Sequence, residues 1–245
     1  DDPHASARDF QRTLAQDQVL TAKVLKLANS AYYGYPKEIG TLSEAVVILG
    51  VGTIKSLVLA LNANQAFSRL TLDGYGLDRG EHWKGSLVCA LVARLIAKHG
   101  GIKDTEKYFI AGLLHDIGKL LLSPYLMKVQ PLIIDCIKKT DVPFDEAERL
   151  ILGFDHAFIG AELALRWKLP ESLRNVIKFH HQPRLASPAD RTVVSSVTVA
   201  DLISYKMKIG AGIDGQTYKE EYEIYKTLGI DKAKIREFIG QVRPM

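Results

Sequence analysis

Cysteine is scarce in this sequence, since only Cys89 and Cys136 occur among 245 residues, each inside an apolar run. So few cysteines exclude a disulfide framework and favour a reducing compartment. Long hydrophobic runs are missing too: no apolar stretch reaches about 18 residues without a charge, and no signal-peptide pattern opens the chain. We therefore expect a cytoplasmic protein without a membrane partner.

A large excess of one charge is also missing. The 32 basic and 28 acidic side chains leave a net charge of +4, which is too small to attract nucleic acid or an anionic membrane strongly. Hydrophobic residues make up 47% and charged residues 24%, which is ordinary globular composition. A chain of this length can bury a sizeable core, as one large domain or two small ones.

Apolar residues recur at helical spacing along nearly the whole chain and strand-like alternation is scarce, so we expect an all-α fold. The Gly-rich stretch 71–80 divides an N-terminal helical lobe, 1–70, from a second helical lobe, 71–208. A further break at 209–217 opens a C-terminal helical extension, 209–245. The predicted helices are 6–15, 17–30, 42–49, 51–69, 81–99, 104–121, 123–138, 144–152, 155–167, 170–180, 190–208 and two in the tail.

Ionisable residues within apolar helices are the main sign of a functional site. His115 and Asp116 follow the apolar run 110–114, and Lys119 shares a helical face with both. Burying these groups without partners is costly, and a transition metal would offset the cost, because imidazole and carboxylate suit iron, manganese or zinc. A His-Asp pair also arises often by chance, so the pair alone does not establish a site.

Further histidines and one more acid strengthen the case for a metal. His156 lies in the first turn of a predicted helix, where it could equally be satisfied by a carbonyl. His180 and His181 end a helix that Pro183 stops, and they could grip one metal or interact with the negative end of that helix. Asp201 is flanked on both sides by apolar helix, where an unpaired carboxylate is rare.

Taken in order, these segments resemble the HD superfamily of metal-dependent phosphohydrolases, and more closely its HDOD branch, which is generally regarded as a signalling output module. The resemblance covers most of residues 5–205 and implies a two-lobed helical fold. In the N-terminal lobe it rests on 25–34 (LKLANSAYYG), 39–42 (IGTL) and 45–50 (AVVILG). In the second lobe it rests on 114–119 (LHDIGK), 153–160 (GFDHAFIG), 167–170 (WKLP), 180–183 (HHQP) and 199–201 (VAD).

The related HD-GYP phosphodiesterases hold a second metal with additional histidines. The positions that resemble those ligands are Asp116, His156, His180 and His181. At the first histidine of the superfamily the resemblance places Gly85, so one ligand of the other metal is missing. Glu81 resembles an acidic ligand of some HD-GYP enzymes. The Gly-Tyr-Pro segment is absent, because 182–185 (QPRL) stands in its place, so cyclic dinucleotide hydrolysis is not supported.

Three functions stay open at this point. The first is a signalling module that contacts other signalling proteins or a small nucleotide-like effector, with a partly retained metal site and little or no catalysis. The second is a metal-dependent phosphohydrolase, in which a metal held by Asp116, His156, His180 and His181 activates water and polarises a phosphate, and Lys119 meets the developing charge. Nucleic-acid binding through 43–49 and 52–61 ranks last, since Lys55 is the single base there. Iron is the favoured metal, with manganese or zinc as alternatives.

Overall fold

The computed structural model of the chain describes residues 39–67, 71–218 and 222–242, together with single positions before residue 39. Within these ranges the structure is helical apart from turns and loops, and strand-type pairing is limited to one isolated bridge between Leu72 and Leu77. The predicted all-α fold is therefore confirmed. The chain divides into two compact units: Asp1–Ala66 with Gly240–Met245, and Phe67–Ile239.

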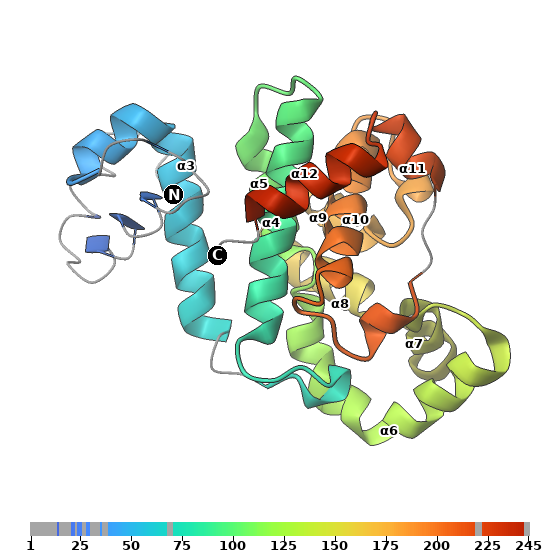
Figure 1. Cartoon of the computed structure of the whole chain (residues 1–245). Coiled ribbons are helices and arrows are strands. Elements are labelled where there is room, and N and C mark those ends of the chain that lie inside the picture. Colours follow the sequence, from blue (N-terminus) through green and yellow to red (C-terminus); the bar gives the residue numbers. More distant parts are fainter. Residues whose placement is uncertain are drawn as a thin grey trace. The chain divides into compact units, whose positions relative to one another are not determined.

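Figure 1 shows the helices in chain order. They are α3 (Leu42–Phe67), η1 (Asp73–Tyr75), α4 (Glu81–His99), α5 (Thr105–Leu114), α6 (Gly118–Thr140), α7 (Phe144–Leu152), α8 (His156–Arg166), α9 (Glu171–Phe179), η2 (Pro183–Leu185), α10 (Arg191–Lys206), η3 (Asp214–Gln216), α11 (Tyr222–Thr227) and α12 (Lys232–Val242). The two helices predicted in the tail are thus present as α11 and α12. The helices predicted at 6–15 and 17–30 fall on residues of which the structure describes only single positions.

Helix α3 begins and bends where its sequence predicts. The Thr41 hydroxyl accepts a hydrogen bond from the Glu44 backbone N–H at 3.1 Å, and Glu44 Oε2 accepts from the Thr41 N–H at 3.0 Å. This reciprocal capping satisfies two N–H groups at the helix start. At Gly50 the backbone turns to φ 84°, which separates 42–49 from the following segment as predicted.

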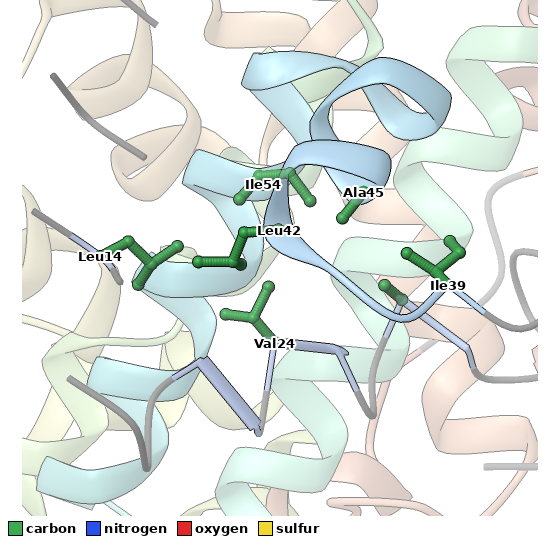
Figure 2. Close-up of a cluster of buried hydrophobic side chains, with 7 residues drawn as sticks. Leu14, Val24, Ile39, Leu42, Ala45 and Ile54 are labelled. Atoms are coloured by element: carbon green, nitrogen blue, oxygen red, sulfur yellow. The ribbon is translucent and has the colours of Figure 1, made fainter. Parts of the chain in front are cut away.

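The first unit has its own apolar core, drawn in Figure 2. The buried side chains of this core are Leu14, Val24, Ala28, Ile39, Leu42, Ala45 and Ile54. Asn29, which belongs to one of the HDOD-like motifs, connects two backbone segments of this unit through hydrogen bonds of its side chain. Its Nδ2 donates to the Leu25 and Ile39 carbonyls at 3.0 and 2.9 Å, and its Oδ1 accepts from the Ile39 N–H at 2.7 Å.

The helix predicted over 104–121 is wrong, because the chain breaks at the turn 115–117 between α5 and α6. The Ile117 N–H donates to the Leu114 carbonyl at 3.1 Å, which is the tighter spacing of a 3₁₀ turn. The physical reason for the break is a backbone contact. A Cβ at Gly118 would overlap the carbonyl oxygen of His156, so α6 starts in a new direction directly against α8.

Close helix packing brings four parts of the second unit to one place. Helix α4 packs against both α5 and α10, while α8 packs against α6 and α9. Gly112 allows the contact between α5 and α4, because a Cβ there would lie 2.8 Å from the Cα of Ala90. As a result, the turn 115–117, the start of α8, the end of α9 and the middle of α10 converge.

Residues 209–218, which the sequence assigned to a C-terminal extension, pack within the second unit. The Ile213 N–H donates to the Tyr75 carbonyl at 2.9 Å. Gly210 lies against α4, since a Cβ at Gly85 would be only 2.8 Å from the Gly210 Cα. We call residues 209–218 the strap.

One stretch, Thr105–Thr140, is long and apolar enough to cross a membrane when judged by length and composition alone, with a window of mean hydropathy 1.4. In the structure the turn 115–117 breaks this stretch, and Asp116 and Lys119 are buried inside the second unit. The absence of a membrane partner stays a prediction.

Replacing Gly118 with alanine tests the backbone contact between α6 and α8. We expect Gly118→Ala to lower the free energy of unfolding by about 2–3 kcal/mol, because the added Cβ meets backbone that cannot rotate away. The matched control is Gly240→Ala in α12, where nothing lies within 4 Å of an added Cβ. This control should keep or slightly raise stability, by up to about 0.5 kcal/mol. Guanidinium titration followed by circular dichroism measures both, and equal stability of the two variants would contradict the packing.

Candidate metal centre

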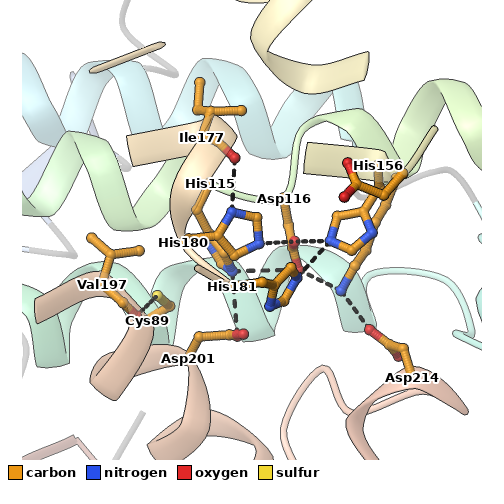
Figure 3. Close-up of polar contacts among 12 residues, drawn as sticks. Cys89, His115, Asp116, His156, Ile177, His180, His181, Val197, Asp201 and Asp214 are labelled. Carbon is orange, nitrogen blue, oxygen red and sulfur yellow. Dashed lines mark hydrogen bonds and ion pairs between the residues drawn. The ribbon is translucent and has the colours of Figure 1, made fainter. Parts of the chain in front are cut away.

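A buried carboxylate, Asp116, lies at the centre of the candidate site (Figure 3). Its Oδ1 is 3.3 Å from the Nε2 atoms of both His156 and His180. Its Oδ2 is 3.3 Å from His115 Nε2 and 2.5 Å from Lys119 Nζ. The two oxygens of one side chain therefore face different groups of partners, supplied by the turn 115–117 and by α6, α8 and the end of α9.

Three imidazoles share a common orientation around this carboxylate. In each one an oxygen acceptor holds Nδ1, which therefore carries the proton and leaves Nε2 facing Asp116. The acceptors are the Gly112 carbonyl for His115 (2.7 Å), the Ile177 carbonyl for His180 (2.8 Å) and Glu148 Oε2 for His156 (2.6 Å). This orientation by a second ring of acceptors is typical of metal-binding histidines.

Glu148 is a supporting residue that sequence reasoning missed. It is fully buried, and its Oε2 also accepts from the His156 backbone N–H at 3.0 Å. Its Oε1 accepts from the Tyr75 hydroxyl at 2.6 Å. Burial opposes a charge on His156, but Glu148 outweighs this and raises the pKa of His156 to about 10. One sign in the sequence indicated that Glu148 is buried: it lies one helical turn after the apolar residue Phe144, on the same face of α7.

His181 lies on the outer side of this cluster. Its Nε2 is 2.9 Å from the His156 Nε2 and 3.0 Å from the Tyr218 hydroxyl. The Tyr218 ring stacks on the imidazole, with centroids 4.5 Å apart and planes inclined by 9°. Tyr218 belongs to the strap, so the end of the strap covers this histidine.

The protonation states around Asp116 suit metal ligation in part. Burial alone would raise the pKa of Asp116, but the charges of His115 and Lys119 outweigh it and hold this pKa well below its usual range. Burial lowers the pKa of His180, and burial together with the charge of His180 holds the pKa of His181 well below its ordinary value. A carboxylate and neutral imidazoles are the forms that bind metals. Burial opposes a charge on His115 and His156, but their acidic neighbours outweigh it and raise the pKa of His115 well above its ordinary value and that of His156 to about 10, so a metal would have to displace protons from these two rings.

Lys119, the predicted phosphate contact, is enclosed by oxygen atoms. Its side chain is 1% exposed, and Nζ lies 2.5 Å from Asp116 Oδ2, 2.5 Å from Asp214 Oδ2 and 3.2 Å from the Tyr205 hydroxyl. Asp214 is fully buried and comes from the strap. Two of the three N–H donors of the ammonium form hydrogen bonds to Asp214 and Tyr205, and Asp116 forms an ion pair with it.

A second group of metal-type side chains lies beside the first. The ligand atoms of Cys89, His115 and Asp201 all lie within 4.8 Å of one another, as do those of the first group, Asp116, His156, His180 and His181. Asp201 Oδ1 is 3.3 Å from His115 Nε2. The structure thus gathers all seven of these residues, six of which the sequence singled out. Cys89 was missed as a ligand because it was interpreted only as an apolar core cysteine.

Two positions of α4 do not lie where the resemblance put them. Gly85, assigned to the first superfamily histidine, packs against Gly210, and the side chain of α4 that reaches His115 and Asp201 is that of Cys89, one turn later. A histidine at position 85 would meet the strap backbone. Glu81 joins neither group of ligands, because it lies at the start of α4 and its Oε2 accepts from the Asp78 N–H at 3.0 Å.

The polar atoms around Asp116 fit a metal, because they contact one another as ion pairs at 3.3 Å and not through hydrogen bonds. Within the described residues, His115 Nε2, His180 Nε2 and Asp116 Oδ1 are buried and make no hydrogen bond. Such atoms are rare in proteins and call for a partner. Imidazole nitrogens with a carboxylate oxygen suit iron, manganese or zinc, so these residues would hold a transition metal of this class.

Three solved structures share the fold. An HDOD domain protein of unknown function from Geobacter sulfurreducens is 26% identical, with a TM-score of 0.75 over 98% of this chain and 78% of its own. A Shewanella amazonensis protein provisionally named a phosphohydrolase is 26% identical, with a TM-score of 0.71 over 99% of this chain and 86% of its own. A Marinobacter aquaeolei protein provisionally named a signal transduction protein is 22% identical, with a TM-score of 0.70 over 99% of this chain and 53% of its own.

A curated relative and a family model complete the comparison. An uncharacterized protein from Treponema pallidum is 28% identical over 206 residues, which cover 82% of this chain but 39% of that protein. The chain therefore spans about two fifths of the length of that relative. The HDOD domain model matches residues 1–183, well over half of the chain. The chain therefore belongs to the HDOD domain family.

Proposed function

We propose that this chain is a signalling output module whose HD-type metal centre orders the fold and turns over little or no phosphoester. Its partners in this proposal are other signalling proteins or a small nucleotide-like effector, and it acts in the reducing cytoplasm. The provisional name of the Marinobacter relative, a signal transduction protein, agrees with this role. The free cysteines Cys89 and Cys136 agree with a reducing compartment.

The enclosure of Lys119 is the observation that carries the proposal. A lysine that stabilises a phosphoryl group must direct an N–H donor at the phosphate oxygen. Here Nζ donates to Asp214 and Tyr205 and is ion-paired with Asp116, and Asp214 is itself fully buried. Freeing the ammonium would leave the Asp214 carboxylate buried without its partner, which costs about 3–5 kcal/mol.

The space between His180, Asp201 and Tyr218 is too small for a substrate, whereas a second pocket of about 280 Å³, lined by Arg149, Lys178 and Gln182 among others, also reaches His181. The cavity lined by His180, His181, Asp201 and Tyr218 has a volume of about 40 Å³. Such a volume holds a few waters, whereas pockets for small organic ligands are about 300–1,000 Å³. The stacked ring of Tyr218 covers one face of the His181 imidazole.

The metal has a structural task in this proposal. A bound metal of this class polarises phosphate and activates water in hydrolytic enzymes. The ligands of this chain come from the turn 115–117, the first residue of α8, the end of α9 and α10. Because a metal binds the folded arrangement and not the unfolded chain, its binding stabilises the contacts among these elements.

A working phosphohydrolase is the second candidate. The observation that favours it is the complete second ligand set, with Asp116, His156, His180 and His181 within 4.8 Å of one another. The Shewanella relative, 26% identical, carries a provisional phosphohydrolase name. In this alternative the strap would have to move away from Lys119 before this lysine could contact a phosphoester.

Removal of the central carboxylate tests the metal centre. We expect Asp116→Asn to lower the transition-metal content of the purified protein at least about tenfold, because the amide removes the charge shared by three imidazoles. The matched control is Asp135→Asn, an exposed acid that forms an ion pair with Lys139, which should leave the metal content unchanged. Mass spectrometry of the denatured proteins measures the metal. Wild-type content below about 0.2 metal per chain after growth in iron-supplemented medium would contradict the centre.

Turnover separates the two candidate functions. We expect the iron-loaded wild-type protein to hydrolyse neither cyclic dinucleotides nor a generic aryl phosphodiester above the rate of Asp116→Ala, because Lys119 and the ligands are enclosed. Product release is followed by absorbance and chromatography. Robust hydrolysis by the unmodified protein that disappears in Asp116→Ala, with the helical circular dichroism spectrum unchanged, would overturn the signalling module and establish the enzyme.

A further inference from the structure

Cys89 occupies a position that a purely structural cysteine does not need. It is fully buried in α4, and its sulfur lies within 4.8 Å of the nearest ligand atoms of His115 and Asp201 (Figure 3). Its thiol donates a long hydrogen bond to the Val197 carbonyl, with 3.8 Å between sulfur and oxygen. The thiol thus shares a polar space with an imidazole and a carboxylate.

The Nε2 atom of His115 faces this space and makes no hydrogen bond among the described residues. Its Nδ1 donates to the Gly112 carbonyl at 2.7 Å, so Nε2 carries the free lone pair. This Nε2 is buried, and Asp201 Oδ1 lies 3.3 Å from it. A buried lone pair beside the two carboxylates of Asp116 and Asp201 is unfavourable unless a proton or a metal cation lies between them.

We propose that Cys89 ligates a second metal ion as a thiolate, together with His115 and Asp201. This position adjoins the centre of His156, His180 and His181, and Asp116 lies between the two, with Oδ2 facing His115 and Oδ1 facing His156 and His180. The inference rests on the proposed metal centre through Asp116. As the sulfur binds, its S–H bond breaks and the proton leaves to solvent, with no oxidation or reduction.

The donor set defines the chemical class of the metal. Thiolate is a soft ligand and selects zinc, iron or cobalt over magnesium, calcium or manganese. The negative charges of the Cys89 sulfur and the Asp201 carboxylate would match a divalent cation in this buried space. The neighbouring centre offers imidazoles and a carboxylate without sulfur, so the two positions differ in the spectrum of a bound metal.

Cobalt substitution tests the thiolate directly. The full chain is stripped of metal, loaded with Co²⁺, and examined by absorbance and mass spectrometry. We expect close to two cobalt ions per chain, a sulfur-to-cobalt charge-transfer band in the near ultraviolet, and visible bands from both ions. Cys89→Ser should lose the near-ultraviolet band and one cobalt while keeping visible absorption. Cys136→Ser, the matched control at the other free thiol, should keep the band and both ions.

The other outcomes separate this inference from the proposed centre. Cobalt bound at about one per chain without a near-ultraviolet band, and lost in His180→Ala, would overturn the thiolate ligand and leave the proposed centre intact. No bound cobalt would overturn both. A band that disappears in Cys136→Ser but not in Cys89→Ser would also overturn the assignment. Because the wild-type spectrum and Cys136→Ser already decide between these outcomes, the test holds even if Cys89→Ser does not fold.

Discussion

The burial of one carboxylate, Asp116, is the constraint on which the second unit depends. A charge taken out of water needs compensation, and here three imidazoles and one ammonium supply it from separate elements of the chain. Each imidazole is in turn fixed through Nδ1, so the positions of Gly112, Ile177 and Glu148 are tied to that of Asp116. The backbone contact at Gly118 supports the same point by bringing the His-Asp turn against the start of α8.

The strap connects this constraint to function. Asp214 neutralises Lys119, and Tyr218 stacks on His181, so a segment late in the chain satisfies the groups that a phosphoester would otherwise contact. Both contacts are internal to the second unit and involve residues that are mostly or fully buried. A site whose polar groups are satisfied by its own chain gains stability and loses access for substrate, which favours a structural role for the metal.

Helical periodicity was enough to predict the fold class, the bend at Gly50 and the two tail helices, because these features follow from local sequence. The break at 115–117 could not be read from periodicity, since it arises from the contact of Gly118 with α8, far along the chain. Among the site residues, ionisable groups in apolar runs were recognisable locally, as for Asp116 and Asp201. The roles of three other residues could be recognised only in the tertiary structure, because their partners are distant in sequence. Glu148 lies 8 residues from His156, Asp214 lies 95 residues from Lys119, and Cys89 lies 26 residues from His115. Comparison of motifs also could not identify which residue of α4 faces His115 and Asp201. It selected Gly85, whereas the structure places Cys89, one turn later, at that position.

The most direct measurement of the central claim is a crystal structure of the iron-loaded protein with anomalous diffraction data at the iron absorption edge. The claim is that the buried charges around Asp116 are a metal centre and not a self-sufficient ionic network. It predicts an anomalous peak about 2.0–2.2 Å from Nε2 of His156 and of His180 and from a carboxylate oxygen of Asp116. The absence of a peak, with the Nε2 atoms of His156 and His180 still 3.3 Å from the Asp116 carboxylate, would contradict it.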